Sequence, residues 1–126
     1  MKNILNQNIL DEFIFNLKYN KYKNKIIDLK IEDCIDGNNV HYIYLNLINI
    51  VKSQRNKGYG TAIMSEITNL ANIYNVQIKL WVTDVYGSDL KRLIFFYKKN
   101  GFTLIKNEMN VQMKYRPRKI KKNNKK

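Results

Sequence analysis

Cysteine is almost absent from this sequence of 126 residues, where Cys34 is the single example. One cysteine excludes an intramolecular disulfide and a cysteine-rich zinc site, and it suits a reducing cytosol. No apolar run approaches the roughly 18 residues needed to cross a membrane, and the first residues lack the apolar stretch of a signal peptide. We therefore expect a cytoplasmic protein without a membrane segment.

Acidic residues are also scarce, because 10 Asp and Glu stand against 23 Lys and Arg, for a formal net charge of +13. Seven of these positive charges fall in residues 116–126. A run of like charge at a chain end is usually solvated, although it can also attract an acidic partner or nucleic acid. The sequence therefore predicts one globular domain over residues 1–115, followed by a basic, disordered tail over 116–126.

Hydropathy patterning predicts an α/β domain without repeats or internal linkers. The expected elements are a helix over 9–19, a strand over 26–33, a strand over 41–51, a helix over 58–74, a strand over 76–83, a helix starting after Ser88, and short strands around 102–105 and 109–115. In the first strand, Ile27, Leu29 and Ile31 are expected on one buried face. The second strand is apolar or aromatic on both faces, which is typical of a strand covered on both sides.

Two of the expected helices carry a clear apolar stripe. The first stripe consists of Ile63, Ile67, Leu70, Ala71 and Tyr74, and the second of Leu90, Leu93, Ile94 and Tyr97. Asn100-Gly101 is expected to end the later helix in a left-handed conformation, and Asp36-Gly37-Asn38-Asn39 is expected to form a turn between the first two strands.

The most informative segment is the loop between the second strand and the long helix, residues 51–62. Gly58 and Gly60 let the backbone turn sharply and let a ligand approach the amides. The first N–H groups of a helix lack internal partners, and the helix dipole adds positive potential there, so the loop is suited to an anion. Neither a Walker A loop nor a dinucleotide fingerprint fits, because no Gly-Lys-Ser/Thr follows and Ile63 stands where Gly or Ala is required.

Two motifs in this chain resemble those of the GNAT acetyltransferases. Arg-x-x-Gly-x-Gly at residues 55–60 resembles the family's pyrophosphate loop. Tyr97 stands four residues before a Gly-Phe pair, 37 residues after Gly60, as in the family's later helix. The resemblance covers about residues 40–115 and looks closest to compact members encoded by bacteriophages. It implies a mixed central sheet, flanked by helices, with two parallel strands that splay apart.

The resemblance also implies an acetyl-CoA cosubstrate, no metal, and a set of site residues. The amides of the loop would hold the CoA pyrophosphate: Arg55, Asn56, Lys57, Gly58, Tyr59, Gly60 and Thr61. The backbone of Ile50 and Val51 would pair with the pantetheine arm, and an amide near Val51 would polarise the thioester carbonyl. Tyr97 would protonate the departing CoA thiolate. Ser88 stands where family members often carry an asparagine that contacts the cofactor.

The general base is not apparent from the sequence, because residues 40–51 contain no carboxylate. Family members often carry a glutamate there. His41 has a suitable unperturbed pKa of about 6.5, and Asp84 follows the second parallel strand. Other side chains would instead position a water chain: Tyr42, Tyr44, Asn46 and Asn49.

Three functions are consistent with these features. The first is transfer of acetyl from acetyl-CoA to a primary amine by direct attack, with a protein lysine or N-terminus as the favoured acceptor and a small-molecule amine as the alternative. The second is a catalytically silent GNAT-like module that binds CoA or a partner. The third is a nucleic-acid-associated protein driven by its basic surface, although no recognised binding motif is present. For each of these functions we expect a monomer or a homodimer.

Overall fold

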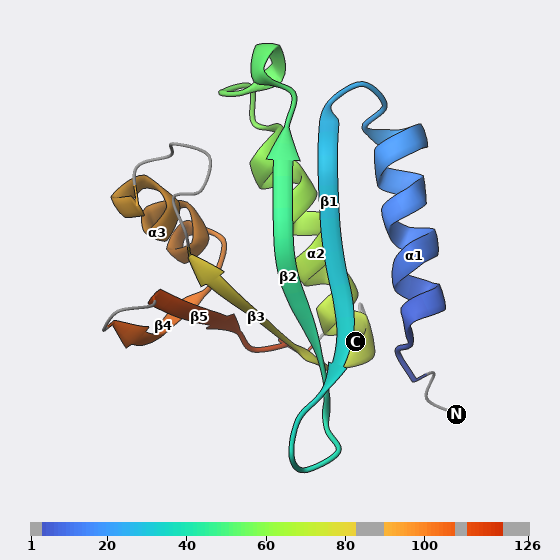
Figure 1. The fold of residues 1–126 in the computed structure, drawn as a ribbon, viewed down its shortest axis with the longest axis vertical. Coiled ribbons are helices and arrows are strands. Elements are labelled where there is room, and N and C mark those ends of the chain that lie inside the picture. The colour runs from blue at the N-terminus through green and yellow to red at the C-terminus, as the bar shows by residue number, and fades with distance from the viewer. Residues whose placement is uncertain (1–3, 83–89, 108–110, 120–126) are drawn as a thin grey trace, which may run out of the picture.

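A computed structural model describes residues 4–82, 90–107 and 111–119 of the chain (Figure 1). Its elements are α1 (Gln7–Asn16), a π-helical turn (Leu17–Lys21), β1 (Ile26–Ile35), β2 (His41–Ile50), a 3-10 turn (Lys52–Gln54), α2 (Tyr59–Tyr74), β3 (Gln77–Val82), α3 (Leu90–Lys99), β4 (Thr103–Asn107) and β5 (Val111–Tyr115). The predicted order of helices and strands is confirmed. No helix in these ranges has the length and apolarity to cross a membrane.

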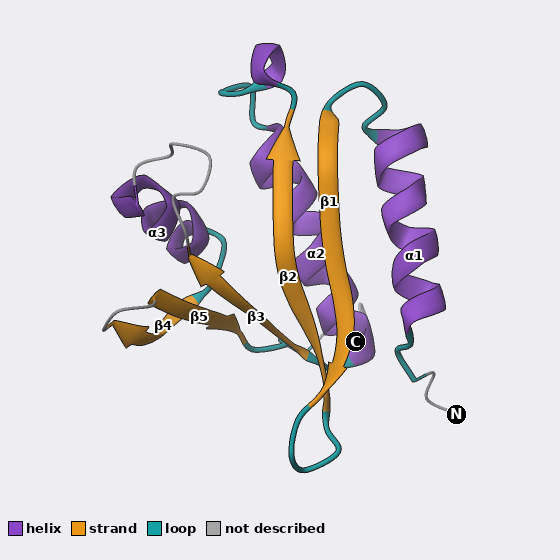
Figure 2. Ribbon diagram, viewed as in Figure 1, coloured by secondary structure: helices purple, strands orange, loops and turns teal. Residues whose placement is uncertain are grey.

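The five described strands form one mixed sheet in the order β1-β2-β3-β5-β4. Strands β2 and β3 are parallel, whereas β1–β2, β3–β5 and β4–β5 are antiparallel. The parallel ladder joins only Tyr42–Tyr44 to Gln77–Lys79. Beyond it the two strands diverge, as Figure 2 shows, so the predicted splay is confirmed.

The core lies on one face of this sheet. Ile43 and Leu45 of β2 point into it, together with Ile78 and Leu80 of β3. The predicted stripe of α2 packs against them, with Met64 added and Tyr74 only partly buried. Leu10 and Leu17 bring α1 and its π-helical turn into the same core. All buried strand residues therefore face the helices.

The predicted pattern of β1 is wrong at its start, because Ile27 is 45% exposed. A register shift between Ile26 and Asp28 makes Ile27 the extra residue of a β-bulge. A bulge moves the following residues by one position, so Ile26 takes the buried place and Leu29 and Ile31 keep theirs. Alternation in the sequence alone does not reveal such an insertion.

The expectation that β2 is covered on both faces is also wrong for the described residues. In Figure 1, α2 lies behind β1 and β2, and none of the labelled helices lies in front of them. The front face carries Tyr42 and Tyr44, which are half-buried, and the neighbouring Trp81 of β3 is 43% exposed. Tyrosine and tryptophan occur on buried faces and on half-exposed faces of a sheet, so hydropathy alone did not show whether this face of β2 is covered.

The predicted inner stripe of α3 holds for Leu93, Ile94 and Tyr97, which pack against the core. Leu90 is exposed instead, and Phe96 takes a place on the packed side. Gly101 ends the helix with φ +95°, a conformation that glycine adopts without strain. The N-cap predicted at Ser88 lies outside the described residues.

The start of the predicted basic tail contacts the domain. The backbone N–H of Arg118 donates to Oδ1 of Asn72 on α2 over 2.7 Å, and the Tyr115 hydroxyl donates to the same oxygen over 2.9 Å. The Arg118 guanidinium also lies over the Tyr115 ring, 5.6 Å from its centroid. Residues up to Arg118 are therefore joined to α2 and β5.

Candidate functional site: the glycine loop and the splayed strands

The glycine loop turns the chain from β2 into α2 through two left-handed residues. Asn56 has φ +64° and Gly58 has φ +85°. Asparagine tolerates this region better than most residues, and glycine adopts it freely. Gly58 occupies the N-cap position of α2, and among the described residues no side chain caps the first turn of that helix. The first N–H groups of α2 are thus left for a ligand.

The basic side chains of the loop play different roles. The Arg55 guanidinium folds back onto the end of β2, where Nε donates to the Ile50 carbonyl over 3.1 Å and Nη2 donates to Asn49 Oδ1 over 3.0 Å. Lys57 is exposed and forms no ion pair with the described part of the chain. Arg55 therefore shapes the loop, whereas Lys57 supplies charge that a ligand can reach.

The side chain of Tyr59 also anchors the loop rather than the anion site. Its ring meets the edge of Tyr22 at a centroid distance of 6.3 Å, and the Lys25 ammonium lies 5.4 Å from its centroid. Both partners belong to the connection between α1 and β1. Among the residues of the loop, Tyr59 would thus serve a ligand only through its backbone amide.

The end of β2 offers one open edge toward β3. The Val51 N–H donates to the Lys25 carbonyl over 2.8 Å, on the side of β1. Because neighbouring residues of a strand turn their amides to opposite edges, the amide of Ile50 faces the gap that β3 leaves. The N–H of Ile50 is therefore open to a ligand in this gap, whereas the Val51 N–H is already used by the Lys25 carbonyl.

A second β-bulge lies where the parallel strands separate. The register shifts between the pairs Lys30–Leu47 and Ile31–Leu45, which makes Asn46 the extra residue of β2. Tyr44, two residues earlier, is the last residue of β2 paired with β3. Bulges bend a strand and increase its twist, so this one accounts for the divergence that opens the gap.

The two motifs noticed in the sequence meet at Gly60. A Cβ atom at this position would lie 3.4 Å from Cζ of Phe96, the residue before Tyr97. Glycine thus lets the first turn of α2 pack directly against the ring carried by α3. The Tyr97 ring contacts Phe96 and Phe102 edge to face, at centroid distances of 5.4 and 5.6 Å. Burial raises the pKa of Tyr97, so its hydroxyl stays protonated at neutral pH.

The candidate bases are distributed unevenly. His41 Nδ1 lies 2.8 Å from Asp33 Oδ1, at the far end of β2 from the glycine loop. Tyr44 lies at the start of the gap, and Asn46 follows it at the bulge. Asn49 is engaged by Arg55. Asp84 and Ser88 lie outside the described residues, so their roles stay predictions.

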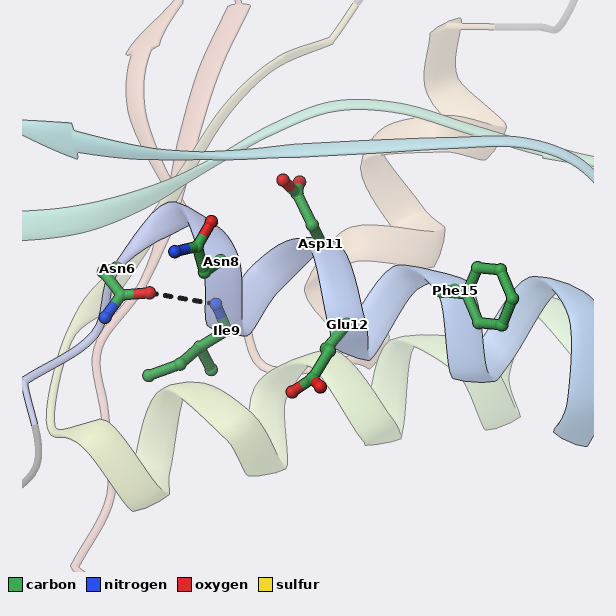
Figure 3. A pocket seen from close by; sticks show the side chains of 6 residues that line it. All are labelled: Asn6, Asn8, Ile9, Asp11, Glu12 and Phe15. Atoms are coloured by element: carbon green, nitrogen blue, oxygen red, sulfur yellow. Dashed lines mark hydrogen bonds between the residues drawn. The ribbon is translucent and has the colours of Figure 1, made fainter.

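A separate hollow of about 530 Å³ lies along α1 and is lined by Asn6, Asn8, Ile9, Asp11, Glu12 and Phe15 (Figure 3). Figure 3 shows α1 alongside α2. Lys21 and Tyr22, which follow α1, contact Glu66 in the middle of α2. The lining residues of the hollow run along α1 from its N-cap to its last turn, and none of them belongs to the glycine loop. Within the described ranges, no three His, Cys, Asp or Glu side chains gather to hold a metal ion.

Comparison with known proteins identifies the fold. No family model matches the sequence, and no curated protein matches it. Among solved structures, PH1933 from Pyrococcus horikoshii matches 71% of this chain and 57% of its own, with 20% identity and a TM-score of 0.57. AtaTR bound with acetyl-CoA matches 70% of this chain and 55% of its own, with 14% identity and a TM-score of 0.52.

A third solved structure matches nearly end to end. Arabidopsis thaliana Naa50, in complex with the bisubstrate analogue CoA-Ac-MVNAL, is 15% identical and has a TM-score of 0.56. The match covers 90% of this chain and 95% of Naa50, whereas this chain spans little more than half of the first two proteins. The chain therefore has the GNAT fold, as the two motifs predicted.

Proposed function

We propose that this protein is an acetyl-CoA-dependent N-acetyltransferase. The observation that carries the proposal is the junction of an uncapped helix N-terminus, entered through left-handed Gly58, with a gap between two parallel strands. The first feature suits a pyrophosphate and the second admits an extended arm. Two proteins of the same fold, AtaTR and Naa50, were solved with acetyl-CoA and with a CoA-containing analogue.

The residues of the gap fit a CoA molecule in distinct ways. The amides of residues 55–61 would surround the pyrophosphate, with Lys57 adding charge from the solvent side. Space is available at Gly58, where a Cβ atom would meet no other atom within 4 Å. The free edge of β2 at Ile50 would pair with the pantetheine amides as a further strand would.

The reaction we propose is direct transfer. The lone pair of a neutral amine attacks the thioester carbonyl carbon, so that a C–N bond forms while the C–S bond breaks. A backbone N–H on the edge of β2 that faces the gap would donate a hydrogen bond to the developing oxyanion. The nitrogen gives its proton to water, and the CoA sulfur gains a proton. Products are the acetylated amine and CoA, and no further reactant is required.

Tyr97 is the proposed hydrogen-bond donor to the CoA sulfur. It lies on α3 beside Phe96, the ring that touches the first turn of α2. Its hydroxyl makes no hydrogen bond within the described part of the chain, so it is free to donate to a ligand. Because burial raises the pKa of Tyr97, the group is a donor rather than a source of phenolate charge.

Two measurements test this function. Isothermal titration calorimetry with acetyl-CoA should show binding in the micromolar range. A thiol assay for released CoA, with a panel of primary amines and peptides, should then show turnover. Absence of binding by the folded protein would overturn the proposal, and binding without any turnover would leave a silent CoA-binding module.

A further inference from the structure

The front face of the sheet carries a row of side chains that crosses four strands. The register places Glu32 of β1 opposite Tyr44 of β2, Tyr44 beside Lys79 of β3, and Lys79 opposite Lys114 of β5. Tyr44 ends the parallel ladder, so this row runs past the point where the strands begin to separate. An acceptor that approaches a thioester at the closed end of the gap from this face therefore lies beside the row.

The charges on the sheet are segregated. All carboxylates of the described strands lie on β1, and β2, β3, β4 and β5 contain no Asp or Glu. Lys79 and Lys114 are half-buried on the front face, and the exposed Trp81 ring lies beside Gln112 between them and the strand ends. On the described strands, negative charge is therefore confined to β1. The Lys79 ammonium lies 4.4 Å from the centroid of the Tyr42 ring and near the Asp36 carboxylate of the β1–β2 turn, and Lys114 is its neighbour on β5.

The other face of the sheet is not open to an acceptor. The core side chains of α1, α2 and the strands fill it, and Ile43 of β2 has no exposed surface. In Figure 1, the front of β1 and β2 is free of the labelled helices. A macromolecular acceptor would thus lie across the front face and bury the aromatic surface of Tyr42, Tyr44 and Trp81.

This segregation matches one kind of acceptor. We propose that the acceptor is the N-terminal α-amine of a polypeptide whose next residues are acidic, with the amine beside Glu32 and Tyr44 and the acidic side chains over Lys79 and Lys114. The inference rests on the proposed acetyl transfer. A chain end extends in one direction only, so its acidic residues meet the lysines without meeting the carboxylates of β1. An internal lysine would carry chain on both sides.

The composition of β2 supports the same choice. The strand that lines the gap contains no carboxylate. An α-amine has a pKa of roughly 7.7–8.0 and a lysine amine about 10.4, so about a tenth of the former and well below about 0.1% of the latter are neutral at pH 7. An enzyme without a carboxylate on this strand to take the proton therefore acts more readily on the α-amine, which is neutral more often than the lysine amine. The net charge of +13 also repels polycationic acceptors.

Three synthetic peptides of equal length test the proposal with the full-length protein and acetyl-CoA. The first has a free N-terminus followed by two acidic residues, the second has two lysines there, and the third repeats the first with a blocked N-terminus and one internal lysine. We expect kcat/KM for the first to exceed the others by roughly tenfold or more, and the difference to shrink in high salt.

Matched charge reversals locate the effect on the protein. The double variant Lys79→Glu with Lys114→Glu should abolish or invert the preference for the acidic peptide. The control, Lys23→Glu with Lys119→Glu, makes the same change in net charge at two exposed lysines outside the strands, and it should retain the preference. Lys79→Gln with Lys114→Gln should give an intermediate result if the glutamates disturb folding.

The outcomes separate this inference from the proposed function. If acetyl-CoA does not bind, both fail. If acetyl-CoA binds but the lysine-containing peptides are acetylated as fast, or the two double variants behave alike, the inference is overturned and the cofactor site stands. Tight binding of a single-stranded oligonucleotide to this face, lost in the Lys79/Lys114 variant while peptide turnover is unchanged, would also overturn it.

Discussion

Gly58 and Asn56 both have a left-handed backbone conformation, but only Gly58 lies at the N-cap of α2, where the pyrophosphate is proposed to bind. The space around Gly58 is open, so a short side chain would enter the volume proposed for the pyrophosphate. Asn and Asp tolerate this backbone region about equally and differ mainly in charge. Substitution by each therefore separates the electrostatic role of the site from its conformation.

We predict that Gly58→Asp weakens acetyl-CoA binding by roughly tenfold or more relative to Gly58→Asn, because a carboxylate would oppose the helix dipole and repel the phosphates. Both variants should lose about 1 kcal/mol of stability, since neither residue adopts positive φ as freely as glycine. Calorimetric titration and urea unfolding measure the two effects. Equal affinities in the two variants would remove the pyrophosphate from the first turn of α2.

At Tyr97, the conservative substitution to Phe keeps the ring that contacts Phe96 and Phe102. Stability and acetyl-CoA affinity should change little, whereas turnover should fall on the order of 10²-fold, the usual effect of one positioned proton donor. The loss should diminish above about pH 8.5, where the thiol leaves as the anion. Steady-state kinetics from pH 6.5 to 9.5 check this. A folded variant with unchanged turnover at every pH would reduce Tyr97 to a packing residue.

At the scale of elements, the glycine loop is held by two hydrogen bonds that the Arg55 guanidinium donates to Ile50 and Asn49 at the end of β2. Arg55→Lys keeps the charge but cannot reproduce two donors in fixed geometry. We predict that it weakens acetyl-CoA binding by about three- to tenfold. Lys57→Met, which removes a charge that forms no ion pair within the described chain, should cost less. A larger loss in Lys57→Met would mean that loop charge outweighs loop shape.

The order of the elements could be predicted because each helix and strand repeats its apolar residues at its own period. The bulges could not, since one inserted residue at Ile27 or Asn46 leaves the local composition unchanged. For the same reason the sequence did not show that Tyr44 ends the parallel ladder. The open front face was missed because tyrosine suits both the core and a half-solvated surface.

In the candidate site, too, some features could be predicted from the sequence and others could not. The two glycines and Tyr97 could be recognised because they are local motifs with fixed spacing. The use of the Val51 amide by Lys25, and the meeting of Gly60 with Phe96, depend on contacts between residues far apart in the sequence. The row from Glu32 to Lys114 depends on the register of four strands. Periodicity within one element carries no information on any of these.

At the scale of the whole molecule, the C-terminal segment divides into two parts. Arg118 bonds to Asn72 and covers the ring of Tyr115, so residues up to this point take part in the domain. Residues 120–126 lie outside the described part of the chain and include four lysines. The boundary between domain and tail is therefore better tested at residue 119 than at residue 115.

Two truncations place this boundary. Removal of 120–126 should change the free energy of unfolding by less than about 0.5 kcal/mol and leave acetyl-CoA binding intact, because the segment lacks apolar residues other than Ile120. Removal of 116–126 should cost about 1–2 kcal/mol more, because Asn72 loses the donor from Arg118 and the Tyr115 ring loses its cover. Urea unfolding of both proteins gives the difference.

The variant Asn72→Ala in the full-length chain removes the shared acceptor of Tyr115 and Arg118, and it should be destabilised at least as much as the longer truncation. Equal stability of the two truncated proteins would place the end of the domain before residue 116, and the contacts of Arg118 would then contribute nothing to folding.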